Sequence, residues 1–249
     1  MLNHVEAGTG VPVVLIHGNF ASSRWWGELL AEPMRGFRWL AVDLPGFSGS
    51  PAPADHRPSI YSFADAVIEL SDALELDAPV IVGHSLGGAV AMEVAVKRPD
   101  QARALVLIDS CPPGGLKTPE AYYPILESYR TSRPALAQAL RAIMPTRQPP
   151  YFDALVDAAA AMHPAAFSGN ARALENWNAA GRTRAYPGPV LVITGVLDPL
   201  ISAEMAARTA AAFARGREVR LEGVGHSPQI EAPARFKAVL ARFLEEVTT

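Results

Sequence analysis

The chain has 249 residues, of which 49% are hydrophobic, so it can bury a core the size of one α/β domain. Its 22 lysines and arginines stand against 25 aspartates and glutamates, and a formal net charge of −3 gives no general attraction for nucleic acids or anionic membranes. One cysteine excludes a disulfide within the chain. Because no basic and apolar leader is recognisable at the start, we expect a cytoplasmic protein.

Short, nearly continuous apolar runs alternate with longer helical patterns along the chain. Such runs are typical of strands that are buried on both faces of a parallel sheet. The predicted strands are residues 11–16, 38–42, 79–82, 104–108, 190–194 and 218–221. The predicted helices are residues 22–34, 60–76, 86–97, 202–214 and 233–246. This alternation predicts an α/β protein with a doubly wound, mostly parallel sheet.

The interval from about residue 112 to residue 186 interrupts the alternation. It has no convincing strand, and its Ala-rich helical stretches are divided by prolines at positions 113, 134, 145, 149, 150 and 164. Helices with Pro-rich joints between two buried strands predict a helical cap over the edge of the sheet. We therefore expect residues 1–111 and 187–249 to form the core and residues 112–186 to form an inserted cap.

The most informative motif is G-x-S-x-G, which here reads Gly83-His84-Ser85-Leu86-Gly87 between a predicted strand and a predicted helix. A sharp turn at this point would hold the central serine in a strained backbone conformation, with its hydroxyl above the sheet. The two glycines let the strand and the helix cross closely. We therefore predict that Ser85 is a nucleophile, the competing interpretation being an ordinary turn with a serine N-cap.

A serine hydroxyl needs a neighbouring imidazole to take its proton, and that imidazole needs a carboxylate. His226 follows the last predicted strand, and Asp198 follows the strand before it. Asp109 ends an earlier strand and competes with Asp198 for the role of the acid. The chain order Ser, Asp, His is the one expected for this architecture. We expect His17 and His84 to orient loops.

Acyl transfer through a tetrahedral intermediate also needs two hydrogen-bond donors for the oxyanion. The Leu86 amide can supply one, and the Asn19 amide in the loop after the first long strand can supply the other, with Phe20 as second choice. Phe20, Trp25 and Trp177 are candidates for an apolar substrate pocket, although each could equally be a core residue. No residue cluster has the spacing of a metal site or a phosphate loop, so we predict no metal and no cofactor.

Five segments of the chain resemble the α/β-hydrolase superfamily, in its branch of serine esterases and haloperoxidase-like enzymes with a helical cap. They are HGNF, DLPGFSGS, GHSLGG, GVLDP and GVGHSPQIEAP, in the order of the family and across nearly the whole chain. The resemblance implies the α/β-hydrolase fold and a triad of Ser85, Asp198 and His226. The loop HGNFASS is also similar to haloalkane dehalogenases, whose nucleophile is an aspartate, so Ser85 argues against that chemistry. Carbon–carbon bond hydrolases commonly carry a Trp after the catalytic His, where this chain has Ser227.

We therefore expect a serine hydrolase that cleaves carboxylic esters, with lactones and thioesters in the same class, through an acyl-enzyme on Ser85. Acyl transfer, perhydrolysis and carbon–carbon bond hydrolysis would use the same triad and stay open as alternatives. A non-catalytic ligand-binding receptor of the same fold is the alternative from another class. The expected partner is a small ester-like molecule, and the oligomeric state is open, a homodimer included.

Overall fold

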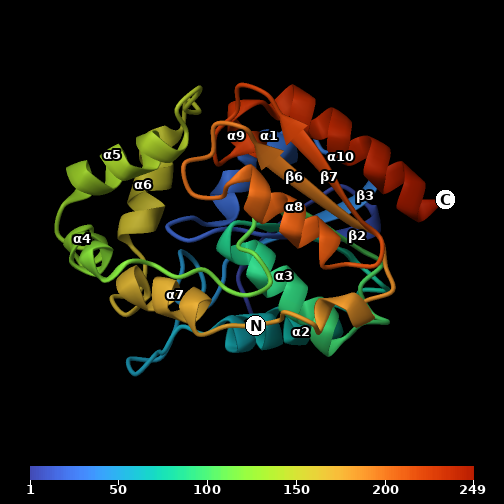
Figure 1. Cartoon of the computed structure of the whole chain (residues 1–249), viewed down its shortest axis with the longest axis horizontal. Coiled ribbons are helices and arrows are strands. Elements are labelled where there is room, and N and C mark those ends of the chain that lie inside the picture. The colour runs from blue at the N-terminus through green and yellow to red at the C-terminus, as the bar shows by residue number, and fades with distance from the viewer.

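A seven-stranded sheet runs through the molecule in the order β1-β3-β2-β4-β5-β6-β7 (Figure 1). The computed structural model describes residues 1–249. Six neighbouring strands are parallel: β3 (Gly36–Val42), β2 (Gly10–Ile16), β4 (Val80–His84), β5 (Ala104–Ile108), β6 (Val190–Gly195) and β7 (Gly216–Leu221). The strand order changes direction between β2 and β4, and ligands of such sheets bind outside the carboxyl ends of the strands at this point.

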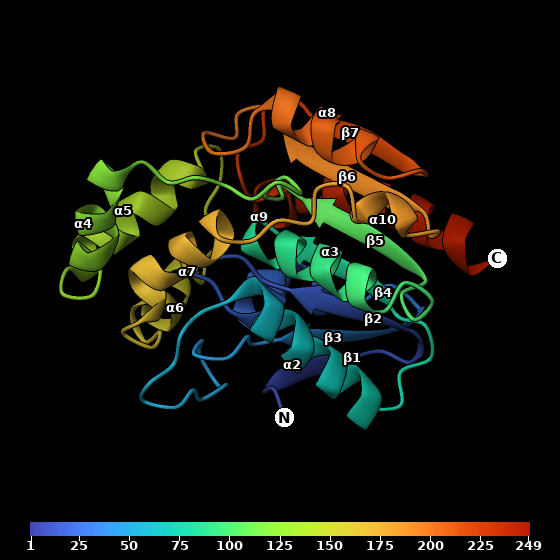
Figure 2. The same cartoon turned by 60° about the horizontal axis from the view of Figure 1, so that its bottom comes forward.

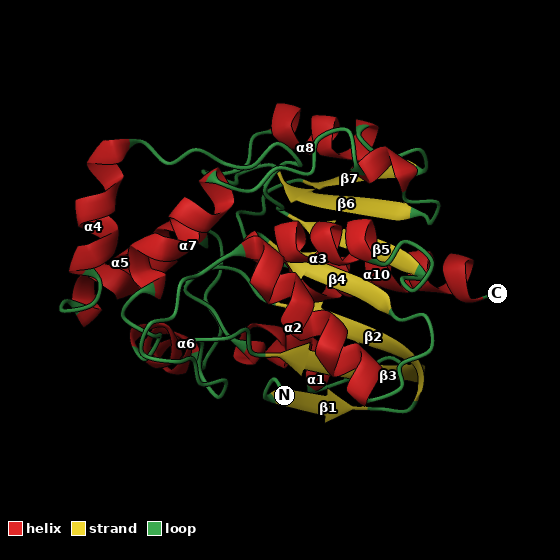
Figure 3. Cartoon of the chain, turned by 90° about the horizontal axis from the view of Figure 1, so that it is seen from below, coloured by secondary structure: helices red, strands yellow, loops and turns green.

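Helices cover both faces of the sheet. On one face lie α2 (Ile60–Ala73), α3 (Leu86–Lys97) and α8 (Ala203–Ala211), which Figure 3 shows in front of the strands. The 3₁₀ turn η1 (Ser23–Trp26), the short α1 (Gly27–Leu30) and α10 (Pro233–Thr248) cover the other face. Successive residues of β4 pack into opposite layers, Ile81 beneath α3 and Val82 beneath α10. Burial on both faces explains why the strands are almost continuously apolar.

Between β5 and β6 the chain leaves the sheet for the inserted segment, residues 112–186. Its helices α4 (Tyr123–Ser128), α5 (Arg133–Ile143), α6 (Phe152–Ala160) and α7 (Ala166–Glu175) gather beyond the carboxyl ends of the strands (Figures 1 and 2). Two 3₁₀ turns, η2 (Glu120–Tyr122) and η3 (Thr183–Ala185), complete it. As the sequence predicts, it contains no strand. Its buried residues, such as Leu136 and Leu155, belong to the same apolar cluster as those of α2 and α3.

Apart from shifts of up to three residues at element ends, the observed elements differ from the predicted ones in three places. Strand β1 (His4–Ala7), antiparallel to β3, was not predicted because its sequence, HVEA, has no apolar run. The helix predicted over residues 22–34 is wrong in length, since it ends at Leu30 before a proline, Pro33, that disfavours helix in the residue preceding it. A short helix, α9 (Pro228–Glu231), precedes α10 and was also missed. None of the helices is both long enough and apolar enough to span a bilayer.

Candidate active site

Ser85 stands on a sharp turn between β4 and α3. Its backbone has φ 54° and ψ −116°, in a region that non-glycine residues rarely adopt. The Ser85 N–H donates to the carbonyl of Ile108 at 2.9 Å, which ties the turn to the end of β5. A Cβ at Gly83 would lie 2.2 Å from the Gly87 carbonyl oxygen, and one at Gly87 would lie 2.3 Å from that of Ile16. The turn therefore closes only with glycine at both positions, as the motif predicts.

His226 lies in the loop after β7 and is buried. Its Nδ1–H donates to Asp198 Oδ2 at 2.7 Å, which leaves Nε2 as the basic nitrogen. Its backbone N–H donates to the Ile143 carbonyl of the inserted segment, and its own carbonyl accepts the Nε2–H of His84 at 2.6 Å. The hydrogen bonds of the site include none between Ser85 Oγ and His226, a contact that often tightens only when substrate is bound.

Two buried carboxyl groups lie beside His226. Ligand atoms of Asp198, Asp109 and His226 all lie within 4.8 Å of one another, a spacing that could also suit a metal ion. Burial opposes the ionisation of Asp198, but the hydrogen bond and charge of His226 outweigh it and hold the pKa of Asp198 below its usual value. Burial and the neighbouring Asp198 raise the pKa of Asp109 well above its usual value. The surroundings therefore favour the ionised form of Asp198 and the neutral form of Asp109.

The backbone explains why the two acids differ. Asp198 Oδ1 accepts two N–H groups of the turn that follows it, at 2.7 and 3.1 Å, and these hydrogen bonds favour the ionised form. Asp109 Oδ1 accepts one N–H, that of Gly195, at 3.0 Å, while its Oδ2 is buried without a hydrogen-bond partner. Of the two acids weighed from the sequence, Asp198 is the one that His226 contacts directly.

Two further histidines hold the surrounding loops. The ring of His84 stacks on Trp25 at 5.7 Å and lies 4.9 Å from the ring of His226, measured between centroids. Burial lowers the pKa of His84 to about 3, so the ring is neutral and acts through its Nε2–H. His17 donates from Nδ1 to the carbonyl of the next residue and accepts the Leu44 N–H at Nε2, and burial lowers its pKa as well. Both rings make the loop contacts expected of them.

The loop after β2 carries the two backbone amides that were weighed as oxyanion donors there, those of Asn19 and Phe20. Phe20 has φ 53°, and its N–H donates to Asn19 Oδ1 at 2.9 Å, so this second-choice oxyanion donor is already engaged. The Asn19 N–H has no protein acceptor. The N–H of Leu86, the first residue of α3, has no acceptor within its helix. The Asn19 and Leu86 amides are therefore free to donate, whereas the Phe20 amide is engaged.

Sequence reasoning missed Asn170, whose Nδ2–H donates to Asn19 Oδ1 at 2.8 Å. This asparagine is fully buried in α7. Phe167 and Leu174 lie at the helical spacing of the same apolar stripe, so a polar residue on that stripe was the available signal.

The aromatic residues nominated for the pocket have different surroundings. The ring of Phe20 meets Tyr129 and Phe167 of the inserted segment edge-on, at centroid distances of 5.7 and 5.8 Å. Trp177 donates its indole N–H to the buried carboxylate of Glu93 at 2.9 Å, two turns along α3 from the elbow. These contacts keep Phe20 as a pocket candidate and favour a packing role for Trp177.

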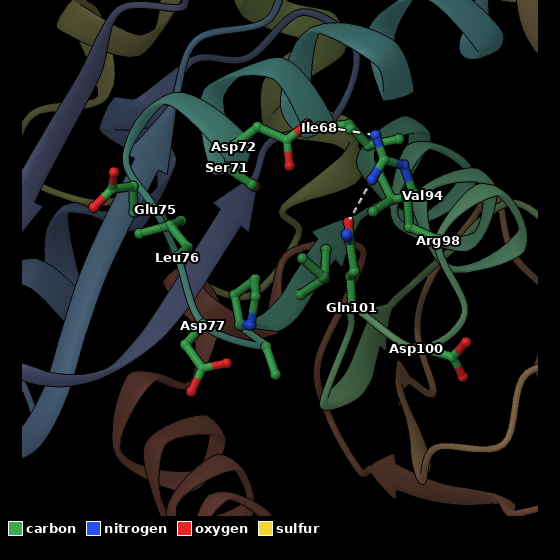
Figure 4. Close-up of a pocket in the computed structure, with 13 residues that line it drawn as sticks. Ile68, Ser71, Asp72, Glu75, Leu76, Asp77, Val94, Arg98, Asp100 and Gln101 are labelled. Atoms are coloured by element: carbon green, nitrogen blue, oxygen red, sulfur yellow. Dashed lines mark hydrogen bonds and ion pairs between the residues drawn. The ribbon is translucent and has the colours of Figure 1, made fainter.

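A separate cavity of about 320 Å³ lies between α2 and α3 at the amino end of β4, the end opposite Ser85 (Figure 4). Arg98 donates there to Asp72 at 3.4 Å and to Gln101 at 3.0 Å. The other acidic groups around it are Glu75, Asp77 and Asp100. The cavity contains no residue of the site described above.

Comparison with known proteins places this geometry in a family. Residues 13–239 match the model of the Alpha/beta hydrolase family. The chain belongs to this family. It is 29% identical over 273 residues to a 2-hydroxymuconate semialdehyde hydrolase from a Pseudomonas species, an alignment that covers 97% of this chain and 89% of the relative.

Solved structures agree. An enol-lactonase from Burkholderia xenovorans has a TM-score of 0.88 at 23% identity, covering 98% of this chain and 96% of its own, and so shares the fold. A putative aryl esterase from Burkholderia cenocepacia has a TM-score of 0.86 at 28% identity, covering 99% of this chain and 94% of its own. The predicted superfamily, its sheet architecture and the hydrolase class are confirmed.

Proposed function

We propose that this α/β hydrolase cleaves carboxylic esters, lactones included, through an acyl-enzyme formed on Ser85. The observation that carries the proposal is the pairing of a strained serine elbow with a buried histidine whose Nδ1 lies 2.7 Å from Asp198. His84 joins the two loops, because it precedes the serine and donates to the His226 carbonyl. Similarity to a putative aryl esterase supports the same class of substrate.

In the proposed mechanism, His226 Nε2 takes the proton of the Ser85 hydroxyl as the oxygen attacks the acyl carbon. Asp198 balances the charge of the resulting imidazolium and keeps the proton on Nδ1. The Asn19 and Leu86 amides donate to the oxyanion of the tetrahedral intermediate. His226 then returns the proton to the leaving alcohol. A water molecule, deprotonated by the same nitrogen, then attacks the acyl carbon. The bond to Ser85 Oγ breaks, His226 returns the proton to that oxygen, and the acid is released.

We propose further that the inserted segment, residues 112–186, caps this site, and that residues 1–111 and 187–249 form the core beneath it. The support is that the segment contacts site loops at two separate points. Ile143 accepts the backbone N–H of His226, and Asn170 donates to the side chain of Asn19. A cap held in this way would exclude water from the acyl-enzyme.

Carbon–carbon bond hydrolysis is the second candidate, favoured by similarity to the 2-hydroxymuconate semialdehyde hydrolase. It would use the same serine, acid and histidine. The residue after His226 is Ser227 where carbon–carbon bond hydrolases commonly carry a tryptophan, and this difference places ester cleavage first.

The test is hydrolysis of p-nitrophenyl esters of increasing chain length, aryl esters and lactones by wild type, Ser85→Ala and the control Ser71→Ala. Ser71 lies beside the distant cavity, so its variant should match wild type. We expect Ser85→Ala to lose turnover of every ester, and mass spectrometry of wild type to find the acyl group on Ser85. Equal rates in wild type and Ser85→Ala would overturn the proposal. Cleavage of 2-hydroxymuconate semialdehyde with no ester turnover would favour the second candidate.

A further inference from the structure

The loop that carries the Asn19 amide is held in an unfavourable backbone conformation. Phe20 has φ 53° although it is not a glycine. Its N–H donates to Asn19 Oδ1 at 2.9 Å, so the asparagine side chain closes a local turn of its own backbone. This hydrogen bond engages the Phe20 N–H, so of these two candidate donors the Asn19 N–H is the one without a protein acceptor. The orientation of that donor thus depends on the Asn19 side chain.

The Asn19 side chain is in turn held from the inserted segment. Asn170 donates its Nδ2–H to the same Asn19 Oδ1 at 2.8 Å. Because Asn19 Oδ1 accepts the Phe20 N–H, the orientation of the Asn19 amide is fixed, and Asn170 must present its amide nitrogen. The contact joins residues that lie 151 positions apart in the chain.

Asn170 makes this contact with its side-chain nitrogen, and its side-chain oxygen has no partner. The side chain is fully buried, and Asn170 Oδ1 has no hydrogen-bond partner. A buried polar group that is only half satisfied destabilises a core, and an apolar residue would fit this position of the α7 stripe better. A buried polar group without its full set of hydrogen bonds is expected where a residue serves function rather than stability.

The rest of the inserted segment supports the same loop. Phe167, one turn before Asn170 on α7, and Tyr129 both meet the ring of Phe20 edge-on. Gly169 brings α7 close to Pro58, since a Cβ at this glycine would lie 3.0 Å from the proline ring. The loop is therefore held by two aromatic contacts and one hydrogen bond, all from the inserted segment.

We propose that Asn170 is a positioning residue for the oxyanion hole, through which the inserted segment fixes the direction of the Asn19 amide. The inference rests on the proposed function, because only acyl transfer through a tetrahedral intermediate needs that amide. Without Asn170, the Asn19 side chain loses one of the two donors that hold it, and the loop can relax from the strained turn. An oxyanion donor acts mainly in the transition state, so its misplacement lowers kcat and leaves KM nearly unchanged.

The experiment measures ester hydrolysis by Asn170→Ala, Asn19→Ala and the double variant, with Asn176→Ala as the control. Asn176 is exposed at the end of α7 and makes no side-chain hydrogen bond, so its variant should match wild type. We expect Asn170→Ala to lower kcat by about 10- to 100-fold, less than the loss of a whole oxyanion donor, with KM within about threefold. Its affinity for a boronic acid that forms a tetrahedral adduct on Ser85 should fall by a similar factor.

The double variant distinguishes positioning from general damage. If Asn170 acts through the Asn19 side chain, its removal from Asn19→Ala changes kcat by less than about twofold. Additive losses in the double variant, or a rise in KM at unchanged kcat, would overturn the inference.

Asn170→Leu nearly keeps the size of the side chain, removes the donor and suits the apolar stripe of α7, so it should lose kcat even if Asn170→Ala folds poorly, and thermal unfolding confirms that each variant is folded. Failure of the proposed function is separate, since it would appear as equal ester turnover in wild type and Ser85→Ala.

Discussion

Changing each buried acid to its amide should have opposite consequences at Asp198 and Asp109. Asp198 is held ionised and accepts the Nδ1–H of His226 at 2.7 Å. In Asp198→Asn the charge that balances the imidazolium is lost, and the amide can present N–H to Nδ1 and favour the wrong tautomer. In serine proteases this change lowers kcat about 10⁴-fold, or about 5.5 kcal/mol in the barrier, and we expect a loss of the same order here.

Burial and the neighbouring Asp198 favour the neutral form of Asp109, so we expect an amide of the same shape to replace it with little change. Asparagine keeps an oxygen for the Gly195 N–H and has an N–H for Asp198, and we expect kcat of Asp109→Asn within about fivefold of wild type, or about 1 kcal/mol. Asp109→Ala leaves the buried Gly195 N–H without its acceptor, and at about 1–3 kcal/mol for one buried group without a partner we expect a destabilisation of that size.

The pH dependence of stability has a definite sign. The pKa of Asp109 is raised in the folded protein, so near neutral pH the unfolded chain is ionised at this residue and must take up a proton to fold. This penalty is absent below the unfolded pKa of about 4 and grows as pH rises toward the folded pKa. Asp109→Asn should therefore become more stable relative to wild type from about pH 4 upward.

The assay is kcat for one p-nitrophenyl ester near pH 8, together with urea unfolding from pH 4 to pH 8. A 10³- to 10⁴-fold loss in Asp109→Asn with near-normal Asp198→Asn would assign the acid role to Asp109 instead. Equal losses in both would mean that Asp109 carries charge in the active enzyme, which contradicts the reasoning from burial.

Two further predictions concern the framework of the site. The pKa of His84 is about 3 in the folded protein against about 6.5 in the unfolded chain, so the free energy of unfolding should fall as pH drops from 6.5, by up to about 1.4 kcal/mol per pH unit. His84→Gln can still donate to the His226 carbonyl, and its melting temperature should depend less on pH than that of wild type. The same pH dependence of the melting temperature in both proteins would refute this. Gly87→Ala should destabilise the fold by about 3 kcal/mol or more, because its Cβ would lie 2.3 Å from the Ile16 carbonyl oxygen. The control is Gly114→Ala, whose Cβ would meet nothing within 4 Å. Similar thermal unfolding of the two variants would contradict the steric argument.

The sequence predicts best those elements that are buried along nearly their whole length. β5 and α3 begin and end at the predicted residues, because an apolar run buried on both faces and a helix after a glycine turn are local signals. β1 was missed because its four residues become a strand only by pairing with β3. Both errors in the first 40 residues concern short elements whose extent is set by neighbours rather than by periodicity.

The sequence by itself determined that a serine, two acids and a histidine each follow a parallel strand, and parallel strands bring their carboxyl ends to one edge of the sheet. The tertiary structure alone decided how Asp198 and Asp109 differ in ionisation, because burial and backbone N–H groups act on each carboxyl group separately. It alone joined Asn170 to Asn19, since hydrogen bonds between side chains are directional and depend on how α7 packs over the loop. The order of these residues along the chain can be read from the sequence, whereas their desolvation and the geometry of their hydrogen bonds depend on how the molecule packs.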